Sequence, residues 1–171
     1  ALRRTTRDEP DYDLLMRSRL DIMRENNLKL SDIQEVIGSM APLDGAKDFL
    51  DELRAQTQVV ILSDTFVQFA NPLMRQLDWP VIFCNHLEVS DDVVVNYHLR
   101  QLDQKRQSVV AFKSLNFKVI AAGDSYNDTN MLTEANHGIL FRAPENIQSE
   151  FPQFTAVTEF NELMRLIEER L

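Results

Sequence analysis

Four short apolar runs, separated by segments with helical patterning, constrain the fold most strongly. They are Val59–Leu62, Val81–Cys84, Val119–Ala122 and Gly138–Phe141. Short continuous runs of this kind are typical of strands that are covered by helices on both faces. Strands that alternate with helices along a chain predict a parallel sheet with right-handed crossovers. We therefore predict an α/β fold with a doubly wound parallel sheet from residue 59 onward.

The chain before the first run is predicted to be helical. Residues 11–26 carry apolar side chains at amphipathic helical spacing. Ser31 followed by Gln34 has the form of a capping box, which predicts that Ser31 caps a short helix. After the second run, residues 87–99 predict a β-hairpin. This order predicts a small helical layer and, beyond it, an α/β core with a hairpin.

Composition excludes several classes of function. The 171 residues carry a net charge of −9, which disfavours a nucleic-acid surface and an anionic membrane. No apolar run approaches the roughly 18 residues of a membrane span, and the first residues lack the apolar core of a signal peptide. A single cysteine, Cys84, fits the reducing cytoplasm. The four glycines are not spaced for a dinucleotide or P-loop motif, and the one cysteine and three scattered histidines do not form a zinc motif.

The sharpest polar cluster follows the third run. Asp124 stands where that strand is expected to end, and Asp128 lies four residues further on. In sheets of this kind ligands bind at the carboxyl ends of the strands, and paired carboxylates suit Mg²⁺. The competing interpretation is a plain turn and helix cap, because residues such as Ser125 and Asn127 favour that geometry without any metal.

Ser63 and Lys105 are further candidates, with weaker individual signals. Ser63 ends the first apolar run, where its hydroxyl and the first amides of a helix would bind a phosphate oxygen, or where it would simply cap that helix. Lys105 is expected at a helix start and would supply positive charge to a phosphoryl group. Its neighbour Arg106 favours an ordinary solvated surface instead.

These clusters, taken in order, resemble the last three motifs of the haloacid dehalogenase (HAD) superfamily. A strand with Ser63, then Lys105, then Gly123-Asp124-x-x-x-Asp128 matches that order, and the sequence is most similar to the phosphoserine phosphatases. Residues 1–42 resemble their helical cap, and residues 43–171 their α/β core. Residues 5–8 and the Ser63-Asp64-Thr65 segment resemble a bifunctional branch that also transfers the phosphoryl group to homoserine.

The resemblance implies a cytoplasmic, Mg²⁺-dependent phosphatase that acts on phosphoserine through an aspartyl phosphate. Its small-molecule partners would be phosphoserine and, for the transferase activity, homoserine; whether the protein is a homodimer is left open. In the cap, an arginine would bind the substrate carboxylate and an aromatic residue would line the pocket. The implied site residues are Ser63 and Lys105 for catalysis, Asp124 and Asp128 for the metal, and Tyr12, Arg19, Ser63, Thr65 and Asn127 for the substrate.

One family motif has no counterpart in this sequence. The family begins with a central strand that ends in an Asp nucleophile, followed two residues later by a second acid. Asp64 follows an apolar run, but Phe66 stands where the second acid would be; Asp11 and Asp13 have the spacing, but lie in a helical pattern. About thirty family residues are therefore expected to be missing, and with them the strand between the Val59 and Val119 runs.

This gap predicts that residues 1–171 do not fold alone into the family structure, because each unmade buried hydrogen bond costs about 1–3 kcal/mol. It also leaves open an inert fragment or a phosphate-binding module of the same fold. A phosphoacceptor receiver domain, using Asp64 or Asp124, is a further alternative, although receivers have neither a helical cap nor a hairpin after the strand. The last alternative is a non-enzymatic interaction protein in which Asp124 belongs only to a capped turn.

Overall fold

The computed structural model describes residues 12–171, so the predictions that concern residues 5–8 and Asp11 lie outside the described residues. The chain divides into two compact units. The first takes in residues up to Pro42 and Ser63–Arg100, and the second Leu43–Leu62 and Gln101–Leu171. No helix among residues 12–171 is both long and apolar enough to cross a bilayer.

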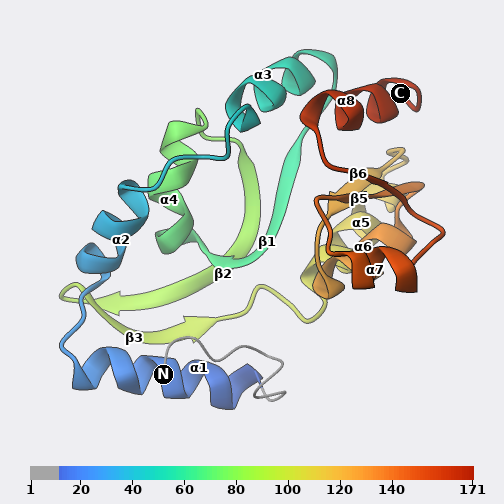
Figure 1. The fold of residues 1–171 in the computed structure, drawn as a ribbon. Helices are drawn as coiled ribbons and strands as arrows, with labels where there is room; N and C mark the ends of the chain where they lie inside the picture. The colour runs from blue at the N-terminus through green and yellow to red at the C-terminus, as the bar shows by residue number, and fades with distance from the viewer. Residues whose placement is uncertain (1–11) are drawn as a thin grey trace. The chain divides into compact units, whose positions relative to one another are not determined.

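In the described part of the first unit, three helices accompany a three-stranded sheet in the order β1-β2-β3 (Figure 1). Its core gathers Met16, Leu20 and Met23 of α1 with Phe66 and Leu87. The elements are α1 (Tyr12–Glu25), α2 (Leu30–Gly38), β1 (Val60–Phe66, which begins in the second unit), α4 (Val67–Gln76), β2 (Val81–Ser90) and β3 (Val93–His98).

The sequence prediction of the first unit needs two corrections. The strand expected to end at Leu62 continues through Ser63 to Phe66, so Ser63 lies inside β1 and not at a helix start. Ser31 is not the cap of α2, because the helix already begins at Leu30. The Ser31 hydroxyl instead donates to Asp92 at the tip of the β2–β3 hairpin, over 2.5 Å. Local capping falls to Asp32, whose carboxylate accepts from the Lys29 amide over 2.9 Å.

The second unit has a parallel sheet in the order β4-β5-β6, with helices around it (Figure 1). Leu132, Ile139 and Leu140 are among its fully buried side chains. The elements are α3 (Ala46–Gln56), α5 (Gln104–Ser114), β4 (Ile120–Gly123), the 3₁₀ turn η1 (Tyr126–Asp128), α6 (Thr129–Glu134), β5 (His137–Phe141), α7 (Glu145–Glu150), β6 (Thr155–Val157) and α8 (Phe160–Glu168). Helix α7 and strand β6 were not among the predicted elements.

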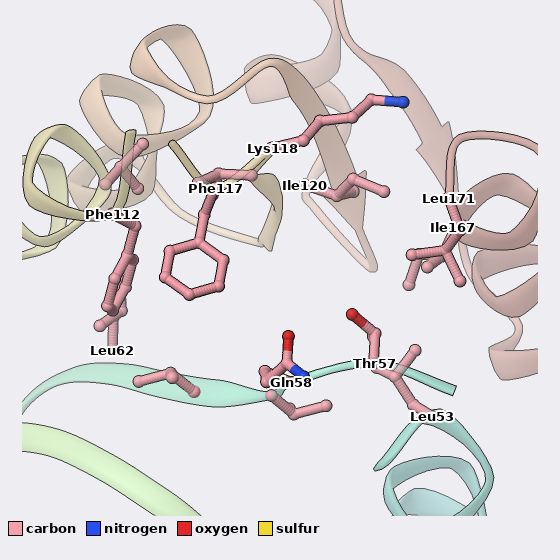
Figure 2. Close-up of a pocket in the computed structure, with 14 residues that line it drawn as sticks. Leu53, Thr57, Gln58, Leu62, Phe112, Phe117, Lys118, Ile120, Ile167 and Leu171 are labelled. Carbon is pink, nitrogen blue, oxygen red and sulfur yellow. The ribbon is translucent and has the colours of Figure 1, made fainter. Parts of the chain in front are cut away.

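An apolar groove of about 370 Å³ lies within the second unit. Figure 2 shows Gln58 and Leu62 on one side of it and Phe112, Phe117 and Ile120 on the other. The groove lies between the start of β1 (Val60 and Leu62) and the start of β4 (Ile120), and within residues 12–171 the only strand that pairs with β4 is β5. The remaining lining residues are Leu53, Thr57, Val59, Val60, Val109, Lys118, Val119, Ile167 and Leu171.

Candidate active site

The turn that follows β4 is built around the carboxylate of Asp128. Its Oδ2 accepts hydrogen bonds from the backbone amides of Asp124 (3.1 Å) and Ser125 (3.0 Å) and from the Ser125 hydroxyl (2.8 Å). Its Oδ1 accepts from Nζ of Lys105, 2.8 Å away on α5. Both oxygens are therefore engaged, and the side chain fixes the backbone of the turn.

Lys105 and Asp128 form an ion pair that is largely closed to water. Their side chains are 12% and 7% exposed. Burial by itself would raise the pKa of Asp128, but the hydrogen bond and charge of Lys105, together with the Ser125 donors, hold that pKa below its usual value. The pair therefore joins the start of α5 to the turn after β4 as two charged groups.

Gly123 makes this arrangement possible. A Cβ at Gly123 would lie 2.5 Å from the Cβ of Asp128 and 2.8 Å from its Oδ2, closer than such atoms approach. The backbone before Asp124 can pass over Asp128 only without a side chain there. The Gly-Asp-x-x-x-Asp spacing in the sequence thus has a steric cause.

The donor set of the turn fits Mg²⁺ in its chemistry. Asp124 and Asn127 are exposed, and both offer the oxygen ligands that this cation prefers. Within residues 12–171 there is no group of three or more His, Cys, Asp or Glu side chains arranged to hold a metal ion. Asp124 and Asn127 are the residues of the turn that would hold the cation. Asp128, already engaged by four donors, is better placed to orient the turn.

The first unit gathers a second set of predicted residues at α1 and the end of β1. Burial raises the pKa of Tyr12, the negative charge of Asp64 raises it further, and the positive charge of Arg19 lowers it. These three groups are therefore close enough to interact. Tyr97 donates to Asp13 over 2.6 Å, and burial together with this bond raises its pKa to about 12. Its ring meets that of Tyr12 edge-on at 6.0 Å.

Two polar side chains that were not predicted from the sequence, the buried Asn85 and the half-buried Gln68, hold the β1 and β2 segments. Asn85 is 2% exposed; its amide donates to the carbonyl of Asp64, and its oxygen accepts from the amide of Arg100, both over 3.0 Å. Gln68 exchanges two hydrogen bonds with the backbone of Leu87. A polar residue inside an apolar strand pattern, as at Asn85, was the available signal.

The predicted site residues thus fall into two groups. Lys105, Asp124, Asp128 and Asn127 belong to the second unit, and the structure joins the first three through hydrogen bonds. The others belong to the first unit: Tyr12, Arg19, Ser63 and Thr65. Convergence of the two groups on one phosphate stays a prediction.

Comparison with known proteins decides the family. Residues 5–133 match the haloacid dehalogenase-like hydrolases. The chain belongs to this family. The predicted enzyme family is confirmed, and the turn with Asp124 and Asp128 lies inside the matched region.

Two HAD relatives are especially similar to the chain. One is named "Phosphoserine phosphatase ThrH", from Pseudomonas aeruginosa, and is 63% identical over 96% of this chain and 81% of its own length. The other, from Pseudomonas syringae pv. tomato, is named a phosphoserine phosphatase and is 60% identical over 96% of this chain and 70% of its own length.

Solved structures confirm the HAD-like α/β fold. A phosphoserine phosphatase in apo form aligns with a TM-score of 0.74 at 20% identity, over 94% of this chain and 83% of that one. A HAD family hydrolase from Salmonella enterica serovar Typhi aligns with a TM-score of 0.75 at 24% identity, over 94% and 57% of the two chains.

We predict that Asp128→Asn destabilises the protein in a pH-dependent way. At neutral pH the loss should be about 3–5 kcal/mol, because the substitution removes the negative charge from a buried ion pair. The folded-state pKa of Asp128 lies below the usual 3.8, so its contribution is fully present above that value and is lost as the pH falls through the folded pKa. Chemical denaturation at neutral pH and at about pH 3 measures the difference in the free energy of unfolding between the two proteins. This difference should be smaller at about pH 3.

The exposed hairpin residue Asp91 offers a matched control. Asp91→Asn should change the free energy of unfolding little at either pH. If Asp128→Asn lowered the free energy of unfolding equally at both pH values, the lowered pKa assigned to Asp128 would be contradicted.

Proposed function

We propose that this HAD hydrolase is a Mg²⁺-dependent phosphoserine phosphatase that acts through an aspartyl phosphate. The observation that carries the proposal is the buried Lys105–Asp128 pair beside Asp124, at the end of a parallel strand. This is where α/β folds bind ligands, and it combines a cation for phosphoryl oxygens with a free carboxylate for a metal. The names of two relatives at 60% identity or more supply the substrate class.

In this proposal Lys105 binds the phosphoryl group while Asp128 holds the ammonium in place. Phosphoryl transfer needs positioning and charge neutralisation above all, because negative charge spreads over the equatorial oxygens of the transferred group. The Ser63 hydroxyl would donate a further hydrogen bond to those oxygens, and Asn127 would contact substrate or the water around the metal. Mg²⁺, held by Asp124 and supported by Asp128, would supply additional neutralisation of phosphoryl charge.

Arg19 is proposed to bind the carboxylate of phosphoserine. A guanidinium is suited to this because it donates two parallel hydrogen bonds to a carboxylate. The half-buried Tyr12 and Thr65 at the end of β1 would line the same pocket. The electrostatic interaction of Tyr12 with Arg19 and Asp64 supports this grouping.

The reaction also needs an Asp nucleophile on a further strand. We propose that this strand fills the apolar groove of Figure 2, where it would pair with the open edge of β4. The P. aeruginosa relative extends beyond the match by about a fifth of its length, which leaves room for such a segment. The nucleophile would then lie at the carboxyl end of a strand next to Asp124.

Two finer features belong to the same proposal. Water would release the phosphate, or homoserine would accept it where the closed site excludes water. The enzyme is proposed to work in the cytoplasm, in keeping with one buried, unpaired cysteine thiol among the described residues.

We expect Asp124→Asn to abolish Mg²⁺-dependent phosphate release from phosphoserine. The substitution keeps the size of the side chain and removes the charge that attracts the cation. Asp48→Asn, at an exposed position in the first turn of α3, is the control and should retain full activity. Undiminished turnover of Asp124→Asn would remove Asp124 from the metal site, and no turnover by the parent protein would favour the phosphate-binding module.

Arg19→Ala should raise the KM for phosphoserine about 10- to 100-fold, the range expected for losing a charge-assisted hydrogen-bonded pair. Activity on p-nitrophenyl phosphate, which has no amino-acid carboxylate, should hardly change. Steady-state kinetics on the two substrates measures the difference. Arg17→Ala, two residues earlier on α1 with an exposed salt bridge to Asp13, is the control. Equal losses on both substrates would exclude the role of Arg19.

Residues 1–171 alone should bind a hydrophobic dye and melt without cooperativity, because the groove and the β4 edge stay uncovered. Fusing the unmatched part of the P. aeruginosa relative to residues 1–171, at the end where it stands in that relative, should suppress dye binding and restore a cooperative melt. A Gly/Ser linker of equal length serves as the control. A cooperative melt of residues 1–171 without dye binding would contradict the missing strand.

A further inference from the structure

Tyr126 connects the turn after β4 to helix α7. Its hydroxyl donates to Oε2 of Glu150 over 2.6 Å and accepts from the side-chain amide of Asn146 at 3.2 Å. Its ring meets that of Phe151 edge-on, with the centroids 6.2 Å apart. The hydroxyl thus both donates and accepts a hydrogen bond. These bonds fix the hydroxyl end of the side chain, and Phe151 packs against its ring.

Helix α7 is a firm support for this contact. Its Ile147 is 1% exposed and belongs to the core cluster of the second unit that also contains Leu132 and Leu140. Asn146 and Glu150 are four residues apart and therefore lie on one face of the helix. The phenol of Tyr126 is bound to a helix that the core already immobilises.

The turn is held from two elements of the second unit. From α5, Lys105 binds Asp128. From α7, Glu150 and Asn146 bind Tyr126, which stands between Ser125 and Asp128 in the chain. The Asp128 bonds to the amides of Asp124 and Ser125 act inside the turn and do not fix it to α7.

We propose that Tyr126 is a positioning residue for Asp124. By binding α7 through its hydroxyl, it holds the backbone of residues 124–128 in the form in which the amides of Asp124 and Ser125 meet Asp128. The carboxylate of Asp124 is thereby oriented before any cation arrives. The geometric part stands by itself, and its consequence for catalysis rests on the proposed function.

Tyr126→Phe in the complete protein tests this, because it removes the hydroxyl and keeps the ring against Phe151. Hydrogen exchange without metal should accelerate about tenfold at the amides of Asp124 and Ser125, and calorimetry should show Mg²⁺ bound about tenfold more weakly, the lower end for groups that orient metal ligands. At subsaturating Mg²⁺, kcat should fall by a similar factor while the KM for phosphoserine stays unchanged.

Three further variants separate positioning from general stability. Glu150→Ala should reproduce the effects of Tyr126→Phe. The double variant should lose no more Mg²⁺ affinity and amide protection than Tyr126→Phe alone, because both substitutions act through one contact. Ser114→Ala, which removes an exposed hydroxyl bond at the end of α5, should change nothing.

The possible outcomes are distinct. Unchanged exchange at Asp124 and Ser125 in Tyr126→Phe would overturn the proposal. So would faster exchange throughout the second unit together with a lower melting temperature, since the tyrosine would then be merely structural. If neither protein binds Mg²⁺ or releases phosphate, the proposed function fails, while the exchange of these two amides still decides the positioning role.

Discussion

The buried ion pair of Lys105 and Asp128 is the interaction on which the site depends. Removing two charges from water is expensive, and their attraction repays that cost only when the remaining hydrogen-bonding capacity is also satisfied. Here Asp128 meets the condition, because the Asp124 and Ser125 amides and the Ser125 hydroxyl occupy its second oxygen. The pair thus ties the start of α5 to the turn, and in the proposed function the same lysine supplies positive charge to the phosphoryl group.

The capping and metal interpretations of the Gly123–Asp128 segment are compatible. Asp128 accepts from the Ser125 amide and hydroxyl as a helix cap does, while the exposed carboxylate of Asp124 stays accessible for the proposed metal ion. The sequence alone could not divide these tasks between two aspartates four residues apart. The clearance at Gly123, where a Cβ would meet Asp128, explains why both can occupy so short a turn.

Most of the fold followed from the apolar runs, because burial decides which segments become strands. The errors arose where distant contacts prevail over local patterns. Asp92 on a hairpin 61 residues away binds Ser31, so the expected cap did not form. Pairing within the β1-β2-β3 sheet carries β1 through Ser63 and Thr65, although their polarity suggested that the strand ends at Leu62. The missed helix α7 begins after Pro144 with an acid in its first turn, which was a usable signal.

For the site, the sequence offered candidate residues but not the contacts between them. The Lys105–Asp128 bond and the Tyr126–Glu150 bond join residues 23 and 24 positions apart, beyond any helical or strand period. The groove beside β4 adds a last constraint. An apolar surface next to an open strand edge is costly in water, and a strand that covered it would also bring its carboxyl end beside Asp124. Stability and catalysis would then require the same segment, so a protein that lacked it would lose both together.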